Sequence, residues 1–145
     1  NAAFTSNIID RARYCLEQLE LEKHGKHAEL GVLGTESVHV EHIIPKRIST
    51  KKSFELFGNW EKYLGNGAHT KHSKYVNKIG NLTLFSGTLN IVASNNPFKM
   101  KKQGYKASSI LMTKELSKMK SFGFSQVDVR SKDLAERAVL RWPTP

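Results

Sequence analysis

The amino-acid sequence predicts a mostly helical α+β domain. Two short segments rich in β-branched residues, 37–44 and 82–85, stand in the middle of the chain and predict two strands. Segments with helical periodicity flank them on both sides. A chain of 145 residues is long enough for one hydrophobic core, so we treat residues 1–145 as a single domain.

Composition excludes several classes of protein. No apolar run approaches the roughly 18 residues that a membrane span needs, so we expect no membrane partner. Residues 1–10 lack the basic start and apolar middle of a secretory signal. Cys15 is the sole cysteine, which excludes an internal disulfide and a cysteine-cluster metal site. These features favour a cytoplasmic protein.

The charge of the chain predicts a polyanionic partner. Lys plus Arg is 23 and Asp plus Glu is 13, which gives a formal net charge of +10. The excess is concentrated between residues 47 and 106, where Glu55 and Glu61 are the only acidic residues. A polyanion is therefore the partner that we expect, and a generally basic soluble protein remains the alternative.

Helical periodicity predicts the two ends of the chain. Segment 6–24 carries an apolar stripe at helical spacing, with Ser6 or Asn7 as its N-cap and Gly25 at its end. Segment 132–142 forms the last helix, capped by Ser131 and stopped by Pro143. Its apolar stripe consists of Leu134, Ala138 and Trp142. Two acidic residues, Asp133 and Glu136, suit the positive end of its dipole. Trp60 and Trp142 are expected in the core.

The middle of the chain alternates strands, turns and further helices. Residues 25–36 hold three glycines and predict a loop, and Pro45 ends the first strand. The basic stretch 46–80 is expected to be irregular, with a short helix over 53–64 and a turn at Gly65-Asn66-Gly67. Helices are then predicted over 88–95, 97–106 and 108–121.

The side chains between residues 39 and 102 include the groups needed to hydrolyse a phosphodiester. The reaction needs a base that activates water, a cation that neutralises charge on the phosphate, oxygen ligands for that cation and basic groups that grip the backbone. His42 titrates in the useful range for a base. Glu41 and Asn90 offer hard oxygen ligands, which suit Mg²⁺ or Mn²⁺.

Two motifs and their spacing carry a family resemblance. Glu41-His42-Ile43-Ile44-Pro45 resembles the first strand of HNH nucleases, and Gly80-Asn81-Leu82-Thr83-Leu84 resembles the second. Asn90 fits the third position, at the start of the metal-binding helix. With Ser94-Asn95-Asn96-Pro97-Phe98 and the lysines after it, residues 37–142 resemble the C-terminal nuclease domain of GmrSD-like, modification-dependent restriction proteins and of related phosphorothioate-sensing defence nucleases.

The resemblance implies a ββα-metal (HNH, or His-Me finger) core at about 37–106, embedded among helices. It implies that His42 is the general base, that Glu41 and Asn90 bind Mg²⁺ or Mn²⁺, and that Asn81 holds the loop that orients His42. Asn81 and Asn90 are thus counted with His42 as catalytic. It further implies phosphate contacts by Lys99 and Lys102, which only the family likeness supports. His39 is a candidate for a supporting residue, one that assists the site without being the base or a metal ligand.

The function implied by the resemblance is that of a DNA-nicking effector in a bacterial restriction or anti-phage system. The chain would be the C-terminal part of a longer cytoplasmic protein whose N-terminal region senses modified DNA and hydrolyses nucleotide. Two other functions stay open: a non-catalytic basic DNA-binding module on the same fold, and an HNH-type RNase.

Each candidate residue also has a structural interpretation. His42 and Asn81 suit a buried hydrogen-bond network or a turn, Glu41 a surface salt bridge, and Asn90 a helix cap. Lys99, Lys101 and Lys102 suit a solvated helix face. Adjacent strand residues point to opposite faces, so Glu41 and His42 converge on one phosphate only if the strand ends or twists there. The same alternation disfavours a zinc site between His39 and His42, three residues apart.

Overall fold

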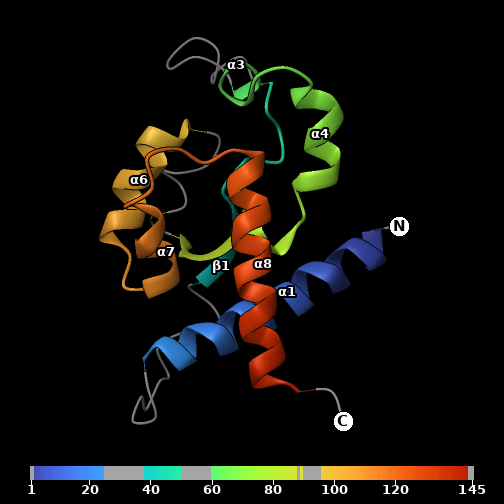
Figure 1. The fold of residues 1–145 in the computed structure, drawn as a ribbon. Helices are drawn as coiled ribbons and strands as arrows, with labels where there is room; N and C mark the ends of the chain where they lie inside the picture. The colour runs from blue at the N-terminus through green and yellow to red at the C-terminus, as the bar shows by residue number, and fades with distance from the viewer. Residues whose placement is uncertain (1, 25–37, 50–59, 88, 90–95, 144–145) are drawn as a thin grey trace.

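The computed structural model describes residues 2–24, 38–49, 60–87, 89 and 96–143 (Figure 1). Within these ranges it contains helices and one pair of strands, which confirms the mostly helical α+β class. The elements in chain order are α1 Ala2–Lys23, β1 Val38–His42, α3 Trp60–Leu64, α4 Ala68–Tyr75, the 3-10 helix η1 Ile79–Asn81, β2 Leu82–Ser86, α6 Phe98–Ala107, α7 Leu111–Leu116 and α8 Phe124–Arg141. The resemblance to a ββα-metal core stays an interpretation of this arrangement.

The two strands pair antiparallel, with Val38 opposite Ser86 and His42 opposite Leu82. We call this pair the hairpin, although its connection is long and contains α3, α4 and η1. The first strand ends at His42, two residues before the predicted end. The backbone N–H groups of Ile43 and Ile44 turn out of the strand and donate to the carbonyl and side-chain oxygens of Asn81, at 2.9 and 2.8 Å. The ladder still includes both Glu41 and His42, opposite Thr83 and Leu82, so these neighbouring side chains point to opposite faces of the strand and do not converge.

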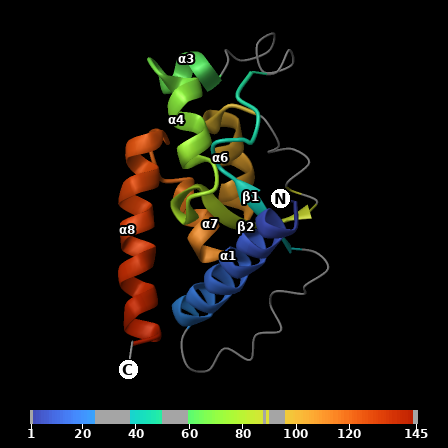
Figure 2. The ribbon, with the colours of Figure 1, turned by 90° about the vertical axis from the view of Figure 1, so that its right-hand side faces the viewer.

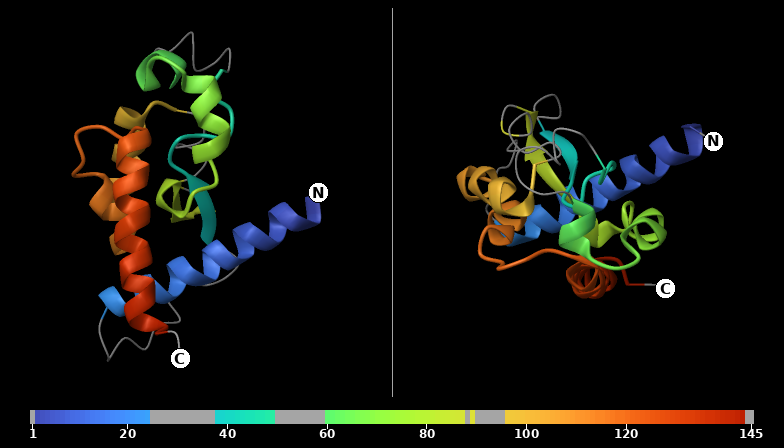
Figure 3. Two further views of the ribbon diagram at one scale, coloured as in Figure 1. Left: turned by 45° about the vertical axis from the view of Figure 1, so that its right-hand side comes forward. Right: turned by 90° about the horizontal axis from the view of Figure 1, so that it is seen from above.

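Helices cover the hairpin on several sides. α6 and α4 lie on opposite sides of the strands in both Figure 1 and Figure 3. α1 and α7 pack against β2, and α8 packs along η1. Figure 2 shows α1 crossing near the lower end of α8, where Arg137 donates to the carbonyl of Leu19 at 3.0 Å and Arg141 bonds Glu22 and Gln18. Two helices from opposite ends of the chain thus stabilise the hairpin. α1 packs on β2, and α8 packs on η1, which precedes β2.

Two clusters of buried side chains form the core. One joins the end of β1 to α3, α4, α6 and the segment before α8, and its fully buried members include Ile43, Ile44, Phe85, Trp60 and Tyr105. The other lies between α1, the strands, α7 and α8, and includes Leu16, Leu19, Leu82, Leu84 and Leu134. The prediction that Trp60 is core is therefore confirmed. The same prediction is wrong for Trp142, which is 40% exposed beyond the end of α8, with its ring centre 6.2 Å from that of Tyr14.

The long terminal helices begin earlier than the sequence predicted. α1 begins at Ala2, so positions 6 and 7 lie inside the helix and neither is its N-cap. α8 begins at Phe124 after Gly123, whose N–H donates to the side-chain oxygen of Gln126 at 2.8 Å. Ser131 is therefore not a cap. Its hydroxyl accepts a hydrogen bond from the N–H of Gly80, so a tertiary contact uses the side chain that local reasoning assigned to capping.

The basic stretch 46–80 is more regular than predicted, because α4 spans residues 68–75 of it. Its polar sequence has no apolar stripe, so periodicity could not reveal it. α7 is shorter than the predicted 108–121 helix, and the carboxylate of Glu20 in α1 accepts hydrogen bonds from the N–H groups of Leu111 and Met112 at its start. α6 and β2 lie where they were predicted. Three predicted segments fall outside the described residues: 25–36, most of 53–64, and the 88–95 helix apart from Leu89.

The described ranges contain no helix that is both long and apolar enough to cross a membrane.

Candidate functional site

His42 is the last residue of β1 and its side chain is buried. Its ring Nε2 lies 3.0 Å from the side-chain oxygen of Asn77, in the turn that follows α4. A carbonyl oxygen only accepts hydrogen bonds, so Nε2 carries the ring proton and Nδ1 keeps a free lone pair. Burial lowers the pKa of His42 below its ordinary value of 6.5, and this outweighs the opposite effect of the bond to Asn77. The imidazole is therefore neutral near pH 7 and has the protonation state of a base.

Asn81 ties together the two segments that present His42 and Asn77. Its side chain is fully buried. The amide nitrogen donates to the carbonyl oxygens of Ile44 and Val76, both at 2.9 Å, and the amide oxygen accepts from the N–H of Ile44. Ile44 lies two residues after His42, and Val76 directly precedes Asn77. Asn81 thus holds the segment that follows His42 and the segment that carries Asn77. Its value for catalysis stays a prediction.

The turn that carries Asn81 is anchored to α8. A Cβ atom on Gly80 would lie 2.1 Å from the carbonyl oxygen of Val127, so only glycine permits this close approach. The guanidinium of Arg130 donates to the carbonyl oxygens of Gly80 and Leu82 at 2.9 and 2.6 Å. Its burial lowers the pKa of Arg130 to about 10, which leaves it charged at neutral pH. These contacts fix Asn81 relative to the longest helix of the C-terminal half.

Glu41 precedes His42 and faces the other side of the strand. Its carboxylate accepts a hydrogen bond from the Lys101 ammonium at 2.5 Å and a longer one from the Tyr105 hydroxyl at 3.4 Å. Lys101 and Tyr105 stand one turn apart on α6, so they present one face to β1. The Lys101 ammonium also donates to the backbone carbonyl of His42 at 2.8 Å.

The Glu41–Lys101 pair is removed from water. Lys101 has 0% and Glu41 5% of its surface exposed. Burial raises the pKa of the Glu41 carboxyl and lowers the pKa of the Lys101 ammonium, while the charge of each partner opposes the shift of the other. The interpretation of Lys101 as part of a solvated face is therefore wrong, because the helix turns this one lysine of the cluster toward the strand.

The described residues do not present a ready ligand set for a divalent cation. Within the described ranges, no three His, Cys, Asp or Glu side chains gather around one point. The Glu41 carboxylate is already neutralised by an ammonium, and it lies across the strand from His42. Asn90, the other predicted ligand, lies outside the described residues. The residues seen here therefore do not fit a preformed metal site, and Glu41 and Asn90 as ligands stay predictions.

The remaining candidates lie on the surface. Lys99 is exposed on α6, and the ammonium of Lys102 lies 6.0 Å from the ring centre of Phe98. His39 is exposed on β1 and belongs to the same strand face as Glu41, opposite His42. His72, which sequence reasoning left out of the site, lies closer to it: its ring bonds the carbonyl oxygen of Pro45 at 2.7 Å and its charge lowers the pKa of His42.

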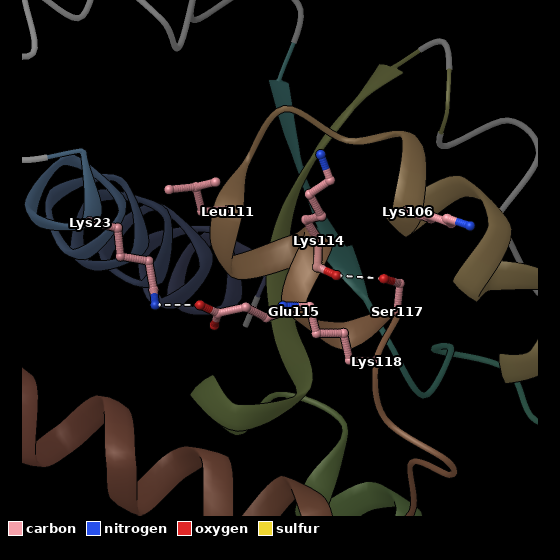
Figure 4. A pocket seen from close by; sticks show the side chains of 7 residues that line it. All are labelled: Lys23, Lys106, Leu111, Lys114, Glu115, Ser117 and Lys118. Atoms are coloured by element: carbon pink, nitrogen blue, oxygen red, sulfur yellow. Dashed lines mark hydrogen bonds and ion pairs between the residues drawn. The ribbon is translucent and has the colours of Figure 1, made fainter.

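A basic concavity at α7 lies apart from these residues (Figure 4). It is lined by Lys23, Lys106, Leu111, Lys114, Glu115, Ser117 and Lys118. Lys23 is paired with Glu115 at 2.7 Å. Figure 4 shows Lys106 and Lys114 extending in different directions rather than toward one point. The concavity contains none of the residues that the sequence singled out.

Sequence reasoning missed the two residues that contact His42 and Glu41 most closely. Asn77 is separated from His42 by 35 positions, and no motif surrounds it. Lys101 was seen only as one member of a lysine cluster. The one available signal was the spacing of Lys101 and Tyr105, which places a cation and an aromatic residue on the same side of a predicted helix.

Comparison with known families agrees with the motifs. The family model described as GmrSD restriction endonucleases, C-terminal domain, matches residues 1–137 of the 145-residue chain. No curated protein and no solved structure matches the chain significantly.

Proposed function

The chain belongs to the family of C-terminal domains of GmrSD restriction endonucleases, and from this premise we propose that it hydrolyses DNA phosphodiester bonds with His42 as the general base. Membership makes it a nuclease domain of restriction-endonuclease type. The HNH mechanism, the metal dependence and the nicking outcome are the parts that we add.

The contact between His42 and Asn77 is the observation that supports this proposal most. A general base must be unprotonated at neutral pH and held in one orientation. Burial keeps His42 neutral, and the bond from Nε2 leaves Nδ1 as the basic atom. The clamp formed by Asn81 holds the two backbone segments that define this orientation.

A divalent cation, Mg²⁺ or Mn²⁺, belongs to the proposal because negative charge accumulates on the phosphate oxygens during hydrolysis. We assign the proton transfer to His42. We assign no position to the cation, because the described residues do not form its ligand set. The exposed Lys99 and the partly exposed Lys102 of α6 are the proposed phosphate contacts.

The decisive experiment incubates the protein with supercoiled plasmid and Mg²⁺ or Mn²⁺, with and without EDTA. Conversion to the nicked circle that EDTA abolishes would support the proposal. Full activity in EDTA would exclude the metal role, and DNA binding without any cleavage would favour the alternative of a basic DNA-binding module. The same assay with RNA of equal length tests the RNase alternative.

We further propose that a single copy cuts one strand, since the site has one base, and that a separate N-terminal region of a longer protein supplies the sensing of modified DNA. The present domain alone should then nick with little sequence preference. Sequencing the nick positions on a plasmid tests this, and one sharply preferred sequence would contradict it.

A further inference from the structure

Lys101 belongs to no sequence motif, but its contacts place it at the candidate site. Its ammonium is fully buried and bonds two groups of adjacent residues, the Glu41 carboxylate and the His42 carbonyl. Both groups lie at the end of β1, where the regular ladder stops. Lys101 therefore contacts both of the last two residues of β1, one of which is the proposed base His42.

We propose that Lys101 is a positioning residue that holds the His42 backbone through its bond to the His42 carbonyl, and that Glu41 serves the site by keeping this ammonium in place rather than by binding a divalent cation. The inference rests on the proposed function of His42. It departs from the metal-ligand role that the family resemblance implies for Glu41.

The geometry on both sides of the strand supports this assignment. The ring of His42 is held by Asn77 on the α4 side, and its carbonyl is held by Lys101 on the α6 side. Together the two contacts fix the peptide and the side chain of one residue. Removing either should let the imidazole turn while the rest of the hairpin stays paired.

The electrostatics explain why Glu41 is needed for this. An ammonium buried without a counter-charge is strongly disfavoured, so Lys101 stays charged only if an anion lies against it. Glu41 provides that anion at 2.5 Å, and Tyr105 supplies a further hydrogen bond to the same oxygen. The ammonium occupies one oxygen of this carboxylate, so a divalent cation on that oxygen would have to displace it.

The experiment is a double-mutant cycle with Glu41→Met, Lys101→Met and the double variant, all in the full 145-residue chain. Each single variant leaves one buried charge unpaired, and should lower the Tm by about 10 °C. The double variant replaces the pair by apolar side chains of similar length, and its Tm should return to within about 5 °C of wild type. Lys106→Met, at an exposed position of the same helix, is the matched control for stability.

Two readouts separate positioning from metal binding and from plain folding. The Kd for Mn²⁺ should change by less than about twofold in the double variant, whereas loss of a metal ligand should weaken it at least about tenfold. The kcat for nicking by the folded double variant should fall about 10- to 100-fold with an unchanged KM for DNA, because the base is misplaced. The ring-nitrogen NMR signals of His42 should shift in the same variant without DNA or metal.

The outcomes distinguish this inference from the function on which it rests. A double variant that binds Mn²⁺ tenfold more weakly would make Glu41 a ligand and overturn the proposal. A stable double variant with wild-type kcat and unchanged His42 signals would make Lys101 purely structural, which also overturns it. If the wild-type protein cleaves no DNA, the proposed function fails, and the NMR signals of His42 still decide whether Lys101 positions the ring.

Discussion

Nε2 of His42 lies 3.0 Å from Oδ1 of Asn77, so a residue in the turn after α4 sets which nitrogen of the strand histidine is basic. The two residues are 35 positions apart, and Asn81 bonds both segments that carry them. This relationship connects the protonation state of the ring to the tertiary structure around it.

Replacing Asn77 by Ala should lower kcat for plasmid nicking about tenfold and leave the KM for DNA unchanged. Without the oxygen acceptor, Nε2 no longer holds the proton preferentially, and part of the population presents the wrong tautomer. Single-turnover nicking measures this. Asn66→Ala, in the exposed turn before α4, is the control. Equal rates for both variants would show that Asn77 does not orient the base.

Replacing His42 by Ala should reduce nicking by roughly 10²- to 10⁴-fold, the usual worth of general acid–base catalysis. DNA affinity should stay near that of wild type, because the grip on DNA comes mainly from phosphate contacts. His69→Ala, which removes an exposed histidine of α4, is the matched control. A pure His42→Ala protein that nicks at the wild-type rate would exclude His42 as the base.

The nicking rate should rise with pH along a limb centred below pH 6.5 and should be level from about pH 7 to 8. Burial lowers the pKa of His42, and the base works only when it is neutral, so activity is lost as the pH falls through that lowered value. Asn77→Asp should move the limb upward, because a carboxylate stabilises the imidazolium. Rates in a constant-ionic-strength buffer series test both statements, and a limb above pH 7 in the wild type would contradict the first.

Replacing Asn81 by Ala should destabilise the domain by roughly 3 kcal/mol, since buried backbone groups of Ile44 and Val76 lose their partners. Urea unfolding followed by circular dichroism measures the free energy of unfolding. Thr70→Ala, on an exposed position of α4, should change it by less than about 0.5 kcal/mol. An Asn81→Ala protein as stable as this control would show that the clamp is dispensable.

The double variant Lys99→Ala/Lys102→Ala should bind duplex DNA more weakly, and its salt dependence should be shallower by about 1.8 in the log–log slope if each lysine neutralises one phosphate. The pair Lys114→Ala/Lys118→Ala, from the basic concavity at α7, is the comparison. Fluorescence anisotropy at several salt concentrations gives both slopes. If only the α7 pair changes the slope, the DNA contacts lie on that face instead.

Local patterns in the sequence were enough for several elements. The β-branched run before Pro45 and the short run after Gly80-Asn81 predicted the two strands, and they pair as a hairpin. A helix was predicted over 97–106, after the interruption at Asn96-Pro97, and α6 lies there. The strand motifs predicted the family that the chain belongs to. These features depend on residues that are close together along the chain, so the sequence alone could reveal them.

The tertiary structure decided which partners the polar side chains of Lys101, Ser131 and Asn77 contact. Lys101 is one of several lysines near residue 100, and only packing of α6 on β1 takes it out of water and against Glu41. Ser131 has the local character of a helix cap, but α8 runs on past it and uses it to hold Gly80. Asn77 has no pattern around it at all. In each case the partner lies 35 to 60 residues away. Contacts over such separations form only when the whole core packs, so periodicity and propensity, which act over one or two turns of the chain, contain no information about them.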